Sequence, residues 1–224
     1  MEKKIKQILM ELGADICGIA NVDKFIDAPT GFHPRDIYRD CKSVIVFAKA
    51  MPKGLLHVSP RIVYNKANDT NLNELDRISF LASTEIEKLG AVVVPLPSDS
   101  PYEYWDADNL EGRGLLSMRH AALLAGIGSM GKNTLIIHKK YGNMISIAAL
   151  LTDLDLSSDP PSKELCIPGC QVCLNSCPSK ALNGKTVNQK DCREYTYHTN
   201  KRGFSVINCN TCRVSCPMAS GDPS

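Results

Sequence analysis

The strongest constraint on this chain is the crowding of cysteines near its end. Eight of its ten cysteines lie in the last 66 of 224 residues. Thiols stay reduced in a cytosolic chain, so such a density indicates metal binding before disulfides. The region reads C-x3-C-x2-C-x3-C-P from Cys166, then Cys192, then C-x2-C-x3-C-P from Cys209. This spacing is typical of a two-cluster ferredoxin.

The eight thiols divide into two complete ligand sets for two 4Fe-4S clusters. In ferredoxin patterns the cysteine before the proline crosses to bind the other cluster. The predicted sets are therefore Cys166, Cys170, Cys173 and Cys216 for one cluster, and Cys177, Cys192, Cys209 and Cys212 for the other. Tetrahedral zinc bound by C-x2-C pairs is the alternative, but both C-P endings and the interleaving favour iron–sulfur. Cys17 and Cys41 are interpreted as small core residues.

The composition changes at the stretch DLSSDPPS, which predicts two domains, 1–158 and 159–224. The first mixes helical and strand patterns, so we expect an α+β or α/β domain. Helices are predicted near 5–13, from caps at 69–71 to Gly90, and after Ser117. Strands are predicted at DICGIA, VIVFAKA, AVVVPLP, TLIIH and MISIAALLTDL, the last two as a hairpin, and residues 97–116 as a loop over a pocket. The second domain has little core, so bound metal is expected to stabilise it.

Charge and hydropathy suggest where such a chain works. The first twenty residues lack the apolar centre and cleavage site of a secretory signal, and the longest apolar run, MISIAALL, is far too short to span a membrane. We therefore expect a cytoplasmic protein without a membrane partner. The 26 basic and 24 acidic residues form no stripe of one sign, which argues against nucleic acid as a partner.

A glycine motif, G-x-G-x-x-G, occurs at Gly126, Gly128 and Gly131. A dinucleotide-binding fold needs a strand before these glycines and a helix after them. Here a helical pattern precedes them and a strand pattern follows, so the dinucleotide interpretation fails. Glycines also permit close approach of the backbone to another surface or to a bulky cofactor. The predicted cofactor-binding block is Gly126, Gly128, Ser129, Met130, Gly131, Lys132, Asn133 and Thr134.

The stretch AGIGSMGKNTLIIHKKYGNMISIAALLTDLDL, followed by two cysteine blocks ending in C-P, resembles the epoxyqueuosine reductases. These are iron–sulfur and cobalamin enzymes related to reductive dehalogenases. LGADICGIA and VIVFAKAMP are similar to that family too. The resemblance implies a nitroreductase-like, corrinoid-binding N-terminal domain docked on a ferredoxin-like domain that carries two 4Fe-4S clusters. Electrons would then pass through the clusters to cobalamin.

Two departures from the family shape the expected chemistry. The family's proton-donating aspartate corresponds to Gly112 here, which leaves Glu111 and Asp108 as candidate catalytic acids. The chain also ends eight residues after Cys216, where longer members continue into helical repeats that help to hold transfer RNA. The N-terminal 158 residues have a net charge of −1. These points predict little epoxyqueuosine reductase activity and a substrate smaller than a transfer RNA.

Three functions remain open at the level of the sequence. The first is an iron–sulfur oxidoreductase with a corrinoid site, acting on a small-molecule substrate or a partner redox protein and supplied by a donor such as ferredoxin or flavodoxin. The second is an electron-transfer protein with two 4Fe-4S clusters, no organic cofactor and a partner enzyme. The third is a reactivase that reduces the cobalt of another protein. His120, Tyr102, Tyr104 and Trp105 are candidates to line a cleft, or simply to anchor a loop.

Overall fold

A four-stranded antiparallel sheet forms the centre of the molecule. The computed structural model describes residues 1–59 and 61–222. The sheet has the order β1-β2-β8-β3, with strands β1 (Ile16–Asn21), β2 (Ser43–Ala50), β8 (Ile145–Thr152) and β3 (Val93–Pro95). The register pairs Ser43 with Asn21 on one side and with Thr152 on the other. The strands predicted at DICGIA, VIVFAKA, AVVVPLP and MISIAALLTDL are thus present, and all four join in one sheet.

Helices cover both faces of this sheet. They are α1 (Glu2–Glu11), α3 (Arg61–Glu87) and α4 (Met118–Leu124), and short helices η1 (Val22–Phe25), α2 (Pro34–Ile37) and η2 (Lys53–Leu56) lie in the connections. Val44 and Val46 of β2 pack in the core with α4, whereas Ile45 and Phe47 pack with α1 and α3. Successive strand residues point to opposite faces, so a strand buried on both faces reads as one apolar run.

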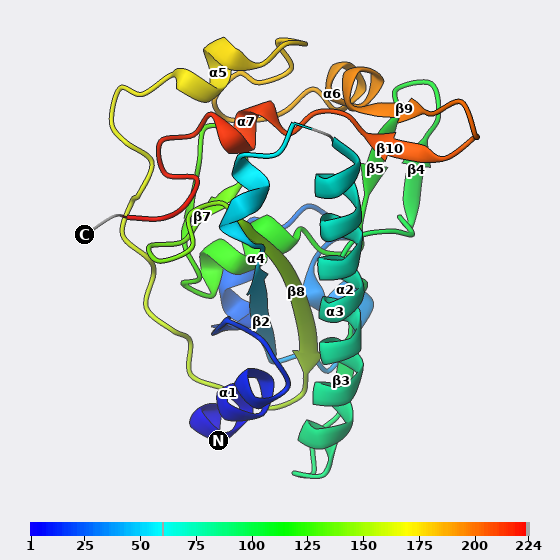
Figure 1. Ribbon diagram of the computed structural model, residues 1–224. Coiled ribbons are helices and arrows are strands. Elements are labelled where there is room, and N and C mark those ends of the chain that lie inside the picture. The colour runs from blue at the N-terminus through cyan, green and yellow to red at the C-terminus, as the bar shows by residue number, and fades with distance from the viewer. Residues whose placement is uncertain (60, 223–224) are drawn as a thin grey trace.

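The cysteine-rich segment lies across one end of the sheet (Figure 1). It forms α5 (Val172–Ser176), α6 (Gln189–Thr196), the hairpin β9 (Tyr197–Thr199) and β10 (Ser205–Ile207), and α7 (Thr211–Val214). Few of its apolar side chains are buried; among the described ones they are Cys173, Cys177, Ala181 and Ala219. The segment therefore depends on its contacts with the rest of the chain. Among the described residues, no helix combines the length and apolar character needed to cross a membrane.

Three predicted elements differ from the structure. α3 begins at Arg61 rather than near residue 70, because its first turns place Tyr64 in a small core with Met51 and Met144. The strand at TLIIH is β7 (Ile136–Ile137), which pairs with β6 (Ser129–Met130) and not with β8, whose neighbours are β2 and β3. Residues 97–116 contain a hairpin as well as loop, formed by β4 (Tyr104–Asp106) and β5 (Glu111–Arg113).

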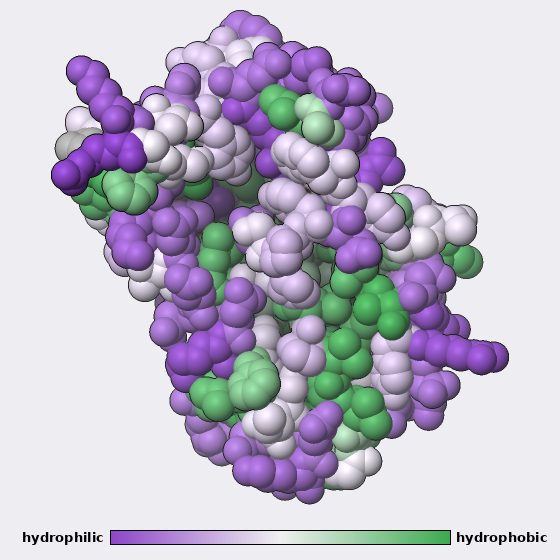
Figure 2. All heavy atoms as spheres, turned by 90° about the vertical axis from the view of Figure 1, so that its right-hand side faces the viewer, coloured by the Kyte–Doolittle hydropathy of each residue, from purple (hydrophilic) through white to green (hydrophobic). Residues whose placement is uncertain are grey.

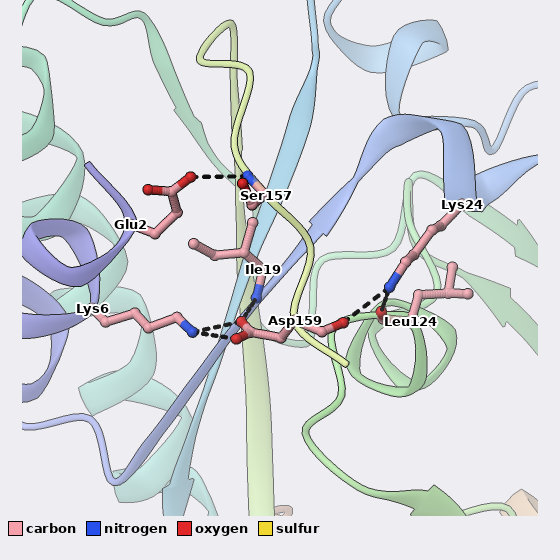
Figure 3. A network of polar contacts seen from close by, with 7 residues as sticks. All are labelled: Glu2, Lys6, Ile19, Lys24, Leu124, Ser157 and Asp159. Carbon is pink, nitrogen blue, oxygen red and sulfur yellow. Dashed lines mark hydrogen bonds and ion pairs between the residues drawn. The ribbon is translucent and has the colours of Figure 1, made fainter. Parts of the chain in front are cut away.

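A polar network fastens the stretch around the predicted domain boundary to the N-terminal elements (Figure 3). The Asp159 carboxylate accepts hydrogen bonds from Lys6 Nζ of α1, at 2.5 and 2.6 Å, and from the Ile19 N–H of β1 at 2.7 Å. Lys24 Nζ donates to the Asp159 carbonyl oxygen at 3.1 Å, and the Glu2 carboxylate accepts from the Ser157 N–H at 3.0 Å. This stretch is therefore bound along its length. The division at 158/159 stays a prediction.

Replacing Asp159 with alanine tests this network. Hydrogen bonds to charged groups contribute about 1.5–3 kcal/mol each, and the side chain of Asp159 is only partly exposed, at 28%, so we expect the free energy of unfolding to fall by about 2 kcal/mol. Urea unfolding followed by circular dichroism measures the change. The control, Asp155→Ala, removes one exposed hydrogen bond to Asn21 and should change stability by less than about 0.5 kcal/mol. Equal losses in both variants would contradict the assignment.

Candidate functional site

The structure brings the first predicted set of cysteines together. Burial raises the pKa of the Cys216 thiol, and the neighbouring Cys173, Cys166 and Cys170 raise it further. Burial likewise raises the pKa of Cys173, with contributions from Cys166 and Cys170. All four border one small pocket of about 20 Å³, together with Lys132 and residues near it. These thiols therefore surround a common space.

The second predicted set also converges. Burial raises the pKa of Cys212 to about 11, against the Arg213 charge, and Cys192, Cys209 and Cys177 add to the rise. Burial raises the pKa of Cys192 too, with contributions from Cys177 and Cys209. The thiols that interact electrostatically are thus members of one predicted set.

The loops of the two sets meet. Ser176, which precedes Cys177, and Ser215, which precedes Cys216, share a hydrogen bond of 2.8 Å between their hydroxyl oxygens. No group of three or more His, Cys, Asp or Glu side chains in the described part of the chain is spaced to hold one metal ion. A cubane makes no such demand, because each of its four thiolates binds a different iron atom.

The glycine block forms hydrogen bonds with both cysteine loops. Lys132 Nζ donates to the Cys170 carbonyl oxygen at 2.8 Å, in the loop of the first set. Asn133 Nδ2 donates to the Cys212 carbonyl oxygen at 2.9 Å, in the loop of the second set. The Ser129 hydroxyl accepts a hydrogen bond from the Leu165 N–H at 2.9 Å. Adjacent side chains therefore fix the two loops relative to each other.

The glycines of the block permit close approach of the chain to itself. A Cβ at Gly126 would lie 2.2 Å from the Pro160 carbonyl oxygen, and one at Gly128 would lie 2.3 Å from that of Ile137. Gly126 also has a φ of 72°, which favours glycine. The structure thus explains both residues by backbone contacts. The predicted cofactor-binding role of the block remains a prediction, and no residue of the block lines the large cleft described next.

A large cleft of roughly 1240 Å³, partly open to solvent, lies between the sheet body and the cysteine-rich segment. Figure 2 shows this face hollowed, with hydrophobic side chains gathered in and below the hollow. Its apolar lining includes Phe25, Phe32, Leu96, Leu115, Leu116, Met118, Leu123 and Leu124. Cys192 and Arg193 of α6 line it from the other side. The cleft is therefore lined by apolar side chains on one side and by Cys192, a member of the second cysteine set, on the other.

The candidate acids occupy different places. Glu111 on β5 lines the cleft, and its carboxylate pairs with Arg113 at 2.7 Å. Asp108 lies in the turn of the same hairpin and is not among the cleft residues. Its neighbour Asp106 has a lowered pKa, because the Asn109 side chain and backbone donate hydrogen bonds to its carboxylate. Glu111 is thus the better placed of the two candidates.

Gly112 is explained by its surroundings. A Cβ there would lie 2.8 Å from the Tyr102 ring, so an acidic side chain would require the ring to move. The Gly112 N–H donates to Gln189 Oε1 at 3.0 Å, and Gln189 Nε2 donates back to the Gly112 carbonyl oxygen at 3.1 Å. This double hydrogen bond clasps β5 to α6, the helix that carries Cys192.

Arg193 strengthens the same clasp. Its guanidinium lies 5.1 Å from the ring centroid of Tyr102 and 5.2 Å from that of Trp105, which stack on each other. Lys190 Nζ donates to the Asp108 carbonyl oxygen at 2.8 Å. This clasp is not predictable from the sequence. The only available signal was the spacing of Gln189 and Arg193, one helical turn apart around Cys192, and spacing alone does not show what they contact.

His120 also lines the cleft. Burial lowers its pKa, and the nearby Arg119 charge lowers it further, which favours the neutral ring. Its Nδ1 lies 2.7 Å from the Ser117 hydroxyl oxygen. Arg119 itself is bound to Thr134 of the glycine block, with 3.0 Å from its guanidinium to the Thr134 carbonyl oxygen. The helix α4 therefore lines the cleft through His120 and contacts the glycine block through Arg119.

Comparison with known proteins identifies the class. No family model matches the chain. Among curated proteins, the epoxyqueuosine reductase of Listeria monocytogenes is 27% identical over 94% of this chain and 62% of its own length. A tetrachloroethene reductive dehalogenase of Desulfitobacterium hafniense is 26% identical over 80% of this chain and 30% of its own. The chain thus spans at most about three-fifths of these relatives.

Solved structures share the fold. The epoxyqueuosine reductase of Streptococcus thermophilus superposes with a TM-score of 0.68 at 22% identity, over 99% of this chain and 67% of that one. The class defined here is the mixed α and β fold common to epoxyqueuosine reductases and reductive dehalogenases. Within this class, the chain is similar in sequence to epoxyqueuosine reductases and shares their fold, as the resemblance of its motifs indicated. Nothing in these comparisons tests the nitroreductase-like and ferredoxin-like descriptions.

One expectation is wrong. The charge pattern argues against nucleic acid as a partner, yet a related epoxyqueuosine reductase forms a complex with an epoxyqueuosine-modified stem loop of tyrosine tRNA. That structure has a TM-score of 0.65 at 20% identity, over 98% of this chain and 65% of that one. The expectation rested on the near balance of charge over the whole chain and on the net charge of −1 over residues 1–158. Residues 159–224 carry eight basic and five acidic side chains, and one of the basic ones, Arg193, lines the cleft.

The clasp between β5 and α6 predicts a change at Trp105, the only tryptophan of the chain. Gln189→Ala removes both hydrogen bonds to Gly112, so the hairpin should move away from α6 and Trp105 should become more accessible. We expect a red-shifted emission and stronger quenching by acrylamide, measured at equal iron content. The control, Gln171→Ala, alters an exposed glutamine at the start of α5 and should leave both signals unchanged. Unchanged emission in Gln189→Ala would contradict the clasp.

Proposed function

We propose that this chain is an iron–sulfur reductase that uses a corrinoid to reduce epoxyqueuosine in an RNA stem loop. One observation carries the proposal: a complete set of four thiols borders, through Cys192, a large cleft with an apolar floor. The names of the relatives support the reaction, and the complex of one of them with a tRNA stem loop supports the substrate. A B12-dependent reductive dehalogenase of the same fold, at a TM-score of 0.60, supports the cofactor class.

The donor sets fit two cubanes. Each predicted set has four thiols with mutual electrostatic contact, and hydrogen bonds from Lys132 and Asn133 hold the loops that carry them. Ser176 and Ser215 link the two loops and keep the sets adjacent. This adjacency supports single-electron transfer from the first set to the second. A donor such as ferredoxin or flavodoxin in the cytoplasm would supply the electrons.

The cleft fits a large, flat and mainly apolar group. Phe25, Phe32 and Leu116 form part of its floor, and Arg193 lies on the wall beside Cys192. A corrinoid held there would supply the metal centre for reduction, while the clusters would supply electrons one at a time. The protein would position the ring, exclude water with the apolar floor and deliver protons. Removing an epoxide oxygen as water takes a pair of electrons and a pair of protons.

Glu111 is the proposed proton donor. Its carboxyl group lies on the cleft side of the hairpin, beside the position where the family's acid would be. Arg113 pairs with it at 2.7 Å and orients it. The clasp from Gln189 holds the adjacent backbone at α6, and so sets the distance between Glu111 and the second cysteine set.

The clusters can be counted directly. Protein prepared without oxygen should contain about eight iron and eight sulfide per chain, because eight thiols provide two ligand sets. Iron and sulfide assays with an absorption spectrum measure this. Zinc in protein made under iron-replete, oxygen-free conditions would overturn it.

Corrinoid binding separates the proposal from the electron-transfer alternative. Cluster-loaded protein incubated with hydroxocobalamin and desalted should retain corrinoid. Intact clusters without retained corrinoid would favour an electron-transfer protein.

Replacing Glu111 tests the proton donor. A missing general acid typically costs about a hundredfold to ten-thousandfold in rate, so Glu111→Gln should slow reduction of an epoxyqueuosine-containing stem loop by that much. The assay uses oxygen-free conditions and a chemical reductant, with product measured by mass spectrometry. Asp108→Asn is the matched control, because Asp108 lies outside the cleft, and it should keep the rate. Equal rates in the two variants would remove Glu111 from the mechanism.

A further inference from the structure

The hairpin β9–β10 at the edge of the cleft has an unusual surface. From Tyr195 to Gly221 the chain carries three basic residues and no Asp or Glu. Two of the three, Lys201 and Arg202, are exposed at the tip of the hairpin beside Phe204, whose side chain is 62% exposed. Basic residues beside an exposed aromatic ring form the combination that binds phosphates and stacks on bases.

The tip is a defined turn. The Asn200 side chain accepts hydrogen bonds from the N–H groups of Arg202 and Phe204, at 3.0 and 3.1 Å. The Asn200 N–H donates to the Phe204 carbonyl oxygen at 2.9 Å, and Gly203 adopts a φ of 85°. The backbone that carries the two cations and the ring is therefore ordered before any partner binds, which lowers the entropic cost of binding.

The base of the hairpin is fixed beside the cleft. The Ile207 N–H donates to the Asn65 side chain of α3 at 2.8 Å, and Tyr197 lines the cleft. Figure 1 shows the hairpin projecting away from the body past β4 and β5. No ion pair within the described residues involves Lys201 or Arg202. Both charges are exposed and thus available to a ligand that contacts the tip of the hairpin.

The segment from Pro97 to Leu116 is mainly acidic. It carries Asp99, Glu103, Asp106, Asp108 and Glu111 and one basic residue, Arg113. Asp99, Glu103 and Glu111 of this segment line the cleft. Because carboxylates repel phosphates, an RNA backbone is favoured at the tip of β9–β10 over this segment, and a single nucleoside could enter the cleft while its backbone stays at the tip.

We propose that the tip of the β9–β10 hairpin, Lys201, Arg202 and Phe204, is a contact surface for the RNA stem loop, with the cations on phosphates and the ring against a base or ribose. This rests on the proposed function, because it identifies how the RNA substrate is held. An acidic redox protein would also be attracted to the cations. The RNA is favoured because an exposed aromatic ring lies on the same hairpin as the cations, and Tyr197 at the base of that hairpin lines the cleft.

The test measures binding of a fluorescein-labelled, unmodified anticodon stem loop of tyrosine tRNA to cluster-loaded protein. The double variant Lys201→Ala/Arg202→Ala should weaken binding about tenfold and flatten the slope of log Kd against log salt by about 1 to 2. Phe204→Ala should weaken binding about fivefold or more, with less change in that slope. The control, Lys3→Ala/Lys4→Ala, removes the same charge from the exposed surface of α1 and should bind like the wild type.

The outcomes separate this inference from the proposed function. If the wild type binds the stem loop and the tip variants bind equally well, the tip surface is wrong while the RNA substrate stands. If the tip variants bind RNA normally but accept electrons poorly from flavodoxin, the hairpin docks a protein and the inference is overturned. If the wild type does not bind the stem loop, both the inference and the RNA substrate fail. Iron content and circular dichroism verify that each variant is folded.

Discussion

Two groups of four thiols must converge in a segment that buries almost no apolar surface, and the rest of the structure follows from this constraint. Short cysteine loops bury too few side chains to hold themselves in position. Polar contacts with the sheet body hold them in place. Lys132 and Asn133 each bind a backbone carbonyl of one loop, at Cys170 and Cys212. Because those two side chains are adjacent on the chain, the separation of the two cysteine sets is determined by the body rather than by the loops.

The central sheet was largely predictable, because its strands are buried on both faces and read as apolar runs. What could not be predicted was which strands pair. TLIIH has the composition of a core strand, yet β7 pairs with β6 across the glycine block, since β2 and β3 already flank β8. The start of α3 was also missed, because Tyr64 packs in a core formed with distant Met51 and Met144. Long-range contacts of this kind leave no local pattern.

The site shows the same division. The grouping of the cysteines was predicted from spacing, because closely spaced cysteines bind one cluster and the cysteine before each proline crosses to the other. Gln189 and Arg193 contact the β4–β5 hairpin, which is far away in sequence. The spacing of these two residues does not predict that contact. The exclusion of nucleic acid failed for a related reason. Net charge averages over a surface, whereas Lys201 and Arg202 lie together, both exposed, at the tip of one hairpin.

Gly112 and Tyr102 lie so close together that a larger side chain at 112 would clash with the ring at 102. A Cβ at 112 lies 2.8 Å from the ring, so a carboxylate at 112 and an aromatic ring at 102 cannot both occupy their present positions. The choice of residue at 112 therefore depends on the residue at 102, in natural relatives and in designed variants alike. An aspartate introduced at 112 alone would displace the ring, loosen Arg193 and disturb the helix that carries Cys192. Moving the acidic side chain from 111 to 112 on β5 therefore requires a smaller residue at 102, introduced before the acid or at the same time.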